Sequence, residues 1–143
     1  MGTYFSAQLA AEHMRAQGTP GSIAMVASIA SHCTIKSQRI SFYAGTKGAV
    51  RIMAQHLAVE LAPLNIRVNT ISPGFTASAM TEQCAVTNPE LYSVFMSAPP
   101  IGRMGTPDDL SPAVLYLLSG ASSYTTGADI PITGGMHAGR ILS

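Results

Sequence analysis

Short strand-like segments alternate with longer helical segments along this chain, and that alternation limits the possible folds more than any other feature. The helical segments repeat their apolar residues every three or four positions, whereas the strand-like segments are short and mostly apolar. Strands that alternate with helices favour a parallel sheet covered on both faces. We therefore predict an α/β fold with the order α-β-α-β-α-β. The expected helices are Thr3–Arg15, Phe42–Leu61 and Thr106–Gly120, and the expected strands are Ile23–Ala27, Ile66–Ile71 and Ala128–Thr133.

Helix-end signals fall at the boundaries of these segments. Pro63 closely follows the second expected helix, and proline cannot continue a helix. Thr106-Pro107-Asp108-Asp109 supplies a capping hydroxyl, a proline at the first helical position and two acids in the first turn, which indicates a helix start. Thr76–Met96 is predicted to form short helices in a flap with a turn at Asn88-Pro89, and Ser31–Ser41 is predicted to be a loop.

Charge and composition limit the classes of partner. The net charge is +1, and no basic stripe or acidic run suggests nucleic acid or an anionic membrane surface. Charged residues make up 10% of the chain, against about 25% in a typical globular domain, while 47% of residues are hydrophobic. A chain of 143 residues suffices for one domain. We therefore expect residues 1–143 to be a single domain, or part of one, whose surface is partly buried in an oligomer or a larger unit.

The two cysteines and the apolar runs point to a cytoplasmic protein. Cys33 and Cys84 lack CxxC spacing, so a disulfide framework or structural zinc site is not expected. The adjacent pair His32-Cys33 is a poor metal site without further clustered ligands, and we predict no metal. The apolar runs are far short of the roughly 20 residues of a membrane span, and the first residues do not form a secretory signal.

Three side chains could carry acid–base chemistry. Ser28 ends the first expected strand, where open parallel sheets place their ligand sites. Tyr43 and Lys47 lie four residues apart at the start of the next helix, so they project from one face. An ammonium near a tyrosine hydroxyl favours its ionised form, and a serine hydroxyl can hold a substrate oxygen. The spacing alone is equally compatible with an ordinary exposed helix start.

Five ordered blocks resemble the short-chain dehydrogenase/reductase family over essentially the whole chain. Tyr43-Ala44-Gly45-Thr46-Lys47 resembles its Tyr-x-x-x-Lys signature, and Ser28 falls where the family keeps its catalytic serine. The resemblance implies a doubly wound, Rossmann-like parallel sheet. The three further blocks are Arg67–Gly74, Pro100–Pro107 and Thr126–Gly135.

The resemblance also implies residue roles. Tyr43 would be the general acid/base, Lys47 would support its ionisation and hold the nicotinamide ribose, and Ser28 would polarise the substrate oxygen. Ser31 is the weaker candidate for that serine. Pro73, Gly74, Thr76 and Ser78 would contact the nicotinamide end of NADP, with NAD possible. The substrate would be a small alcohol or carbonyl compound. Five side chains are expected to line or cover the pocket, although ordinary packing explains each of them equally well. They are Met80, Cys84, Tyr92, Phe95 and Met96.

Two departures from the family pattern shape these expectations. No Thr-Gly-x-x-x-Gly-x-Gly follows a strand, so the chain is expected to represent the C-terminal, catalytic half of the fold without its dinucleotide-binding βαβ half. Tyr43 follows Ser28 by fifteen residues, a longer interval that resembles the fungal mannitol dehydrogenase and sorbose reductase branch. That branch implies a polyol/ketose pair.

The resemblance leaves two readings of the chain open. In the first, it is an NAD(P)-dependent oxidoreductase that interconverts a secondary alcohol and a ketone. In the second, it is a truncated, inactive fragment that acts only by associating with full-length subunits. The family forms a four-helix contact between subunits through the helices that match Thr3–Arg15 and Phe42–Leu61, so a homo-oligomer is expected. The alanine-rich faces of these helices fit such close packing, although alanine is also simply a good helix former.

Overall fold

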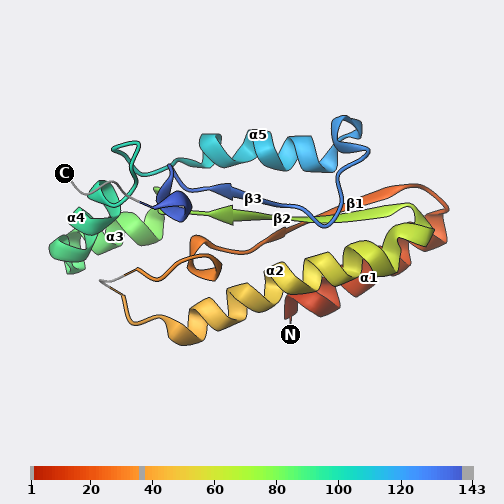
Figure 1. Cartoon of the computed structure of the whole chain (residues 1–143), viewed down its shortest axis with the longest axis horizontal. Coiled ribbons are helices and arrows are strands. Elements are labelled where there is room, and N and C mark those ends of the chain that lie inside the picture. The colour runs from red at the N-terminus through yellow and green to blue at the C-terminus, as the bar shows by residue number, and fades with distance from the viewer. Residues whose placement is uncertain (1, 36–37, 140–143) are drawn as a thin grey trace.

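A computed structural model describes residues 2–35 and 38–139. Three parallel strands form one sheet in the order β1-β2-β3, which confirms the predicted fold class. β1 (Gly21–Val26) pairs with β2 (Ile66–Pro73), and β2 pairs with β3 (Asp129–Ile132). Since all three strands are parallel, their carboxyl ends meet at one end of the sheet (Figure 1).

Helices cover both faces of this sheet (Figure 1). α1 (Gly2–Gln17) and α2 (Ser41–Leu61) lie on one face, and α5 (Pro107–Leu118) lies on the other. Two short helices, α3 (Ala79–Thr87) and α4 (Pro89–Ser97), extend beyond the carboxyl end of β2. The described residues also form four 3₁₀ turns. They are η1 (Ile29–Ser31), η2 (Ala62–Leu64), η3 (Gly120–Ser122) and η4 (Met136–Ala138).

The predicted element boundaries agree closely with the structure. α2 ends at Leu61, just before Pro63, and α5 begins at Pro107 with a capping box between Thr106 and Asp109. Asn88 ends α3 and caps α4 through a bond from Leu91 N–H to its side-chain oxygen. Of the loop predicted for Ser31–Ser41, residues 36 and 37 lie outside the described residues, and its first residue belongs to η1.

The expectation that alanine-rich faces of α1 and α2 form a subunit contact needs correction. Ala7 and Ala11 are buried in the chain's own core beside Ala54 and Ala58 of α2, because small side chains let the two helices approach the sheet closely. The apolar side chains that these helices expose are larger. They include Phe5 and Leu9 of α1 and Ile52 and Val59 of α2.

The ends of β2 and β3 approach each other closely at Gly74. A Cβ atom at this position would lie 2.8 Å from Cα and 3.3 Å from the carbonyl oxygen of Thr133. Thr133 is buried, and Gly74 N–H donates to the carbonyl of Ile132 at 2.8 Å. The contact is therefore with backbone that cannot move without disturbing the ladder, and this explains the glycine after Pro73.

We expect the Gly74→Ala variant to lose about 1–3 kcal/mol of unfolding free energy, since the added methyl group must displace the Thr133 backbone. Gly48→Ala is the matched control, because a Cβ at Gly48 meets no atom within 4 Å. Alanine inside a helix should stabilise that variant by about 0.5–1 kcal/mol. Urea denaturation measures both changes, and a neutral or stabilising effect at Gly74 would refute the steric argument.

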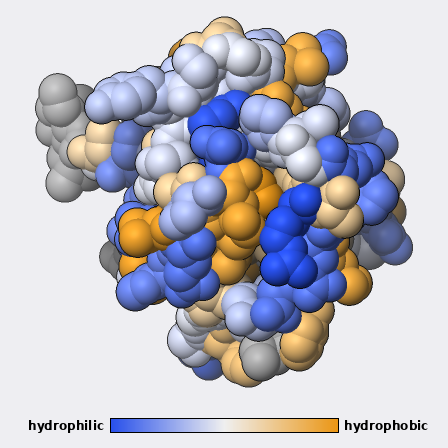
Figure 2. Space-filling model, turned by 90° about the vertical axis from the view of Figure 1, so that its right-hand side faces the viewer, coloured by the Kyte–Doolittle hydropathy of each residue, from blue (hydrophilic) through white to orange (hydrophobic). Residues whose placement is uncertain are grey.

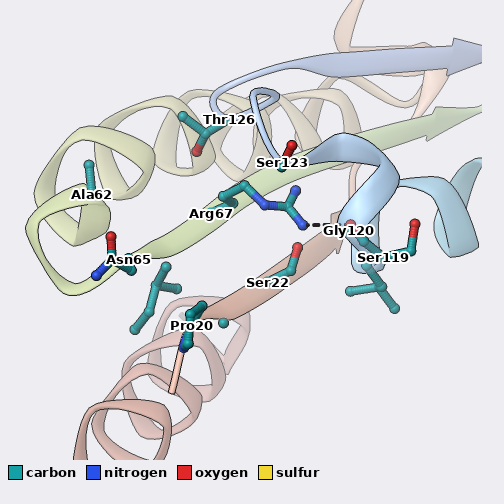
Figure 3. A pocket seen from close by; sticks show the side chains of 12 residues that line it. Pro20, Ser22, Ala62, Asn65, Arg67, Ser119, Gly120, Ser123 and Thr126 are labelled. Carbon is teal, nitrogen blue, oxygen red and sulfur yellow. Dashed lines mark hydrogen bonds between the residues drawn. The ribbon is translucent and has the colours of Figure 1, made fainter. Parts of the chain in front are cut away.

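A hollow lies at the end of the molecule where the strands begin. Figure 2 views this end, where hydrophobic atoms gather in the centre with hydrophilic groups around them. The hollow has a volume of about 500 Å³ and lies between Pro20, Asn65 and the segment after α5. Arg67 of β2 points across it toward Ser119 and Gly120 (Figure 3). Its guanidinium donates to the carbonyl oxygens of Leu117, Ser119 and Thr125 and to Ser122 Oγ.

An ion pair lies at the amino-terminal end of α5. Arg103 donates through both terminal nitrogens to the Asp109 carboxylate at 2.7 and 2.8 Å, and Thr106 N–H donates to the same carboxylate at 2.7 Å. The bond from Arg103, and then that from Thr106, hold the pKa of Asp109 well below its usual range. The pair therefore ties the loop before α5 to the first turn of that helix.

The Asp109 carboxylate should contribute a stability that depends on pH. Because its pKa is lowered on folding, the contribution is complete above the unfolded pKa of about 3.9 and is lost as pH falls toward the folded value. We expect Asp109→Asn to be less stable than wild type at pH ~6 and the difference to shrink below about pH 4. The pair is partly exposed, so the effect should be small. Urea midpoints between about pH 2 and 7 test this. A difference that is the same at every pH would contradict it.

Among the described residues, no helix combines the length and apolar character needed to cross a bilayer.

Candidate active site

A cavity of about 640 Å³ opens at the carboxyl ends of β1 and β2. Every residue that the sequence assigned to catalysis or cofactor contact lines it. These residues come from separate parts of the chain, and the fold brings them together because parallel strands end at the same edge. They are Ser28, Tyr43, Lys47, Pro73, Gly74, Thr76 and Ser78.

Ser28 follows the last residues of β1 and begins η1. Its backbone is extended (φ −169°, ψ 155°), and its side-chain oxygen accepts a bond from Ala30 N–H at 3.2 Å. The residue is 8% exposed. Since Oγ acts as the acceptor in that bond, the hydroxyl hydrogen has no acceptor among the described residues and is available to an oxygen in the cavity.

Tyr43 and Lys47 lie in the first turns of α2 and face the same cavity. Lys47 Nζ is 5.9 Å from the centroid of the Tyr43 ring and donates to the carbonyl oxygen of Val26 at 2.9 Å. This bond joins α2 to the end of β1 and leaves two ammonium hydrogens for other acceptors. Tyr43 is 45% exposed, and its hydroxyl has no hydrogen-bond partner within residues 2–35 and 38–139.

The opposite wall is formed by the segment that leaves β2. Pro73 ends the strand, Gly74 follows it, and the backbone from Phe75 to Ala77 is paired with Gly105. Thr76 Oγ1 bonds to the carbonyl of Gly74 at 3.3 Å. Ser78 caps α3 in a capping box with Thr81. The wall is thus held by backbone pairing on one side and by a helix cap on the other.

The structure separates the two serine candidates by position. Ser31 does not line the cavity, because its hydroxyl donates to the carbonyl of Ser28 at 2.7 Å within η1. Of the two serines, Ser28 lines the cavity, and Ser31 supports the turn that holds it.

The cavity walls include residues that the sequence analysis missed. Of the five expected lining residues, Met80, Cys84 and Phe95 line the cavity, whereas Tyr92 and Met96 do not. α4 presents Leu91 and Phe95, four residues apart, on its cavity-facing side. An apolar spacing could have indicated this pair. Other lining residues come from loops and helices that only the fold brings together. They include Ile35, Gln38, Ile40, Thr81 and Leu110.

His32 and Cys33 point to different partners. His32 contacts Asp129 and Ser72, whereas Cys33 Sγ faces the carbonyl of Met136 at 3.9 Å. Burial raises the pKa of the Cys33 thiol, which disfavours the thiolate that a metal would need. Within the described part of the chain, no three His, Cys, Asp or Glu side chains are grouped so that they could hold a metal.

Comparison with known proteins shows the family of this chain. The model of the enoyl-(acyl carrier protein) reductase family matches residues 1–137. A short-chain type dehydrogenase/reductase from Mycobacterium marinum superposes with a TM-score of 0.85 at 41% identity, covering 93% of this chain and 51% of that one. The chain belongs to the short-chain dehydrogenase/reductase family.

Two further members of the short-chain family resemble this chain. A sorbose reductase of Schizosaccharomyces pombe is 41% identical over 134 residues, which are 94% of this chain and 51% of that protein. A gluconate 5-dehydrogenase from Burkholderia cenocepacia, in complex with NADP and tartrate, superposes with a TM-score of 0.85 at 30% identity over 97% of this chain and 53% of the other. The resemblance to the sorbose reductase branch is thus confirmed. This short-chain family member spans about half the length of the relatives it matches.

Proposed function

We propose that this protein takes part in the NADP-dependent interconversion of a secondary alcohol and a ketone, with a polyol and its ketose as the substrate pair. The observation that carries the proposal is the common cavity of Ser28, Tyr43 and Lys47 with the Pro73–Gly74 turn. Similarity to a sorbose reductase and to an NADP-bound gluconate 5-dehydrogenase supports the substrate class and the cofactor.

The residues around the cavity fit the nicotinamide end of such a cofactor. The two free hydrogens of the Lys47 ammonium suit ribose hydroxyls, and Pro73, Gly74, Thr76 and Ser78 offer a wall of backbone and small polar groups. The described residues contain no glycine-rich turn between a strand and a helix that would cradle the phosphates, so they would hold this end only. When bound, the nicotinamide supplies or accepts the hydride.

The chain's own side chains would handle the proton and the oxygen. Ser28 Oγ–H donates to the substrate carbonyl oxygen and polarises it. Tyr43 gives its phenolic hydrogen to that oxygen during reduction and takes it back during oxidation. The Lys47 ammonium stabilises the phenolate that remains after the proton has left. The apolar walls at Phe95 and Leu110 exclude water from one side of the cavity.

The direct test is NADPH and NADH oxidation by the purified protein with a panel of ketoses and apolar ketones of similar size. We expect oxidation with NADPH and a ketose and a weaker response to the apolar ketones. A folded sample that oxidises neither cofactor with any ketone would refute the proposal and favour a role through association with other subunits.

A further inference from the structure

We propose that His32 and Asp129 are a positioning pair that holds the Ser28 turn against the strand ends lining the opposite side of the cavity. The inference rests on the proposed function. His32 Nε2 lies 2.7 Å from Asp129 Oδ2 and 3.1 Å from Ser72 Oγ. The two side chains lie 97 positions apart in the chain and are 19% and 9% exposed.

The hydrogen-bond pattern determines the direction of each bond. Thr70 Oγ1 donates to Asp129 Oδ1 at 2.6 Å, and Ser72 Oγ donates to the same carboxylate at 2.8 Å. Since Ser72 has only one hydroxyl hydrogen, its oxygen meets His32 Nε2 as an acceptor. The hydrogen of the imidazole must therefore be on Nε2, where it faces both Asp129 and Ser72. Thr70 and Ser72 are buried, so the carboxylate has fixed donors from β2 and one donor from η1.

Each partner is attached to a segment that leads into a different wall of the cavity. His32 ends η1, and its N–H donates to the carbonyl of Ile29, so its position is coupled to the turn that Ser28 begins. Asp129 begins β3, which pairs with Thr70–Pro73 at the carboxyl end of β2, and Ser72 directly precedes Pro73 and Gly74. η1 and the ends of β2 and β3 lie at the same end of the sheet (Figure 1). The pair therefore sets the separation between Ser28 and the Pro73–Gly74 wall.

A reaction between a substrate held at one wall and a cofactor held at the other depends on that separation. A misplacement of about 1 Å at a reacting centre can lower the rate roughly 10²-fold. His32 would not itself touch substrate or cofactor, since it is absent from the cavity lining. Its contribution would be to hold the Ser28 hydroxyl in place, and its loss should reduce kcat more than it raises the KM for the cofactor.

The experiment compares His32→Leu with His32→Gln, because the glutamine amide nitrogen can occupy the place of Nε2 and donate to Asp129. We expect kcat for the best ketose to fall about 10²-fold in His32→Leu, with the cofactor KM unchanged, and to recover largely in His32→Gln. His13→Leu is the matched control, because His13 lies exposed on α1, and it should leave kcat unchanged. Amide hydrogen exchange should show faster exchange at the backbone N–H of position 32, which bonds to the Ile29 carbonyl, in the leucine variant alone.

The outcomes separate this inference from the proposed function. Wild-type turnover with an unchanged kcat in His32→Leu would overturn the positioning role and leave the proposed function intact. Equal losses in the leucine and glutamine variants would also overturn it, because the donor would then not matter. No turnover in the wild type would overturn both, whatever the exchange experiment gave.

Discussion

Replacing Tyr43 with phenylalanine should lower kcat/KM for the ketose by about 10²–10⁴-fold while leaving the fold unchanged. The substitution removes only the phenolic O–H and keeps the ring in the cavity. The substrate oxygen would then have to take its proton from water, and the Lys47 ammonium would have no phenolate to stabilise. Since the Tyr43 hydroxyl has no bond to another described residue, its loss should not change the unfolding free energy measurably.

The assay is NADPH oxidation with the best ketose of the panel, with urea denaturation of the same samples. Tyr124→Phe is the matched control, because Tyr124 is fully exposed on the segment after α5 and should behave like wild type. Retention of wild-type turnover by Tyr43→Phe would exclude Tyr43 as the proton donor. A loss of activity accompanied by unfolding would attribute the effect to stability instead.

Among these substitutions, Arg67→Leu should cause the largest loss of stability, about 2–4 kcal/mol of unfolding free energy. Hydrogen bonds from a charged donor contribute about 1.5–3 kcal/mol each, and water would replace them only in part. The guanidinium lines the hollow at the amino ends of the strands and points across it (Figure 3). There it satisfies the Leu117 and Ser119 carbonyls at the end of α5, and its charge lies favourably at the negative end of that helix.

Lysine at position 67 should recover part of this stability. It keeps the charge, but one ammonium cannot span the carbonyls of Ser119 and Thr125 as the planar guanidinium does. Urea denaturation of Arg67→Leu and Arg67→Lys measures both effects. Arg15→Leu, at an exposed position in the last turn of α1, should change stability by less than about 0.5 kcal/mol. A change of similar size at both arginines would refute the capping role.

Local signals allowed most of the secondary structure to be predicted. The capping residues before Pro107 and the proline after α2 set helix ends through interactions within a few residues, so the sequence around them is sufficient. The end of β2 was harder to predict from the sequence. The strand continues to Pro73 because β3 pairs with Thr70 to Pro73, and that partner comes more than fifty residues later. The spacing of apolar residues within β2 does not indicate this pairing with β3.

The residues of the candidate site could be predicted from the sequence, whereas the contacts that hold the surrounding segments in place could not. Ser28, Tyr43 and Lys47 were found from strand ends, helix spacing and family resemblance, and the structure places them at one cavity. The contacts of His32 and Arg67 could not be predicted, because their partners are distant in the chain and depend on how the strands align. The alanines of α1 were also misassigned, since a small-residue face is equally suited to a sheet and to another subunit.

The parallel register of the sheet has a consequence for how the chain reaches its native state. Gly21 pairs with Ile66, and Thr70 pairs with Asp129, so neither pairing can form until a segment of several dozen residues, with its helices, has closed into a loop. Closing long loops carries an entropic penalty that only the completed sheet offsets. The helices should therefore form early and the strands should pair late. The backbone groups of β1 that bond to β2 stay unpaired until the two strands meet. Folding should be slow for a chain of this length, and the protein should be most prone to aggregate in the interval before the strands pair.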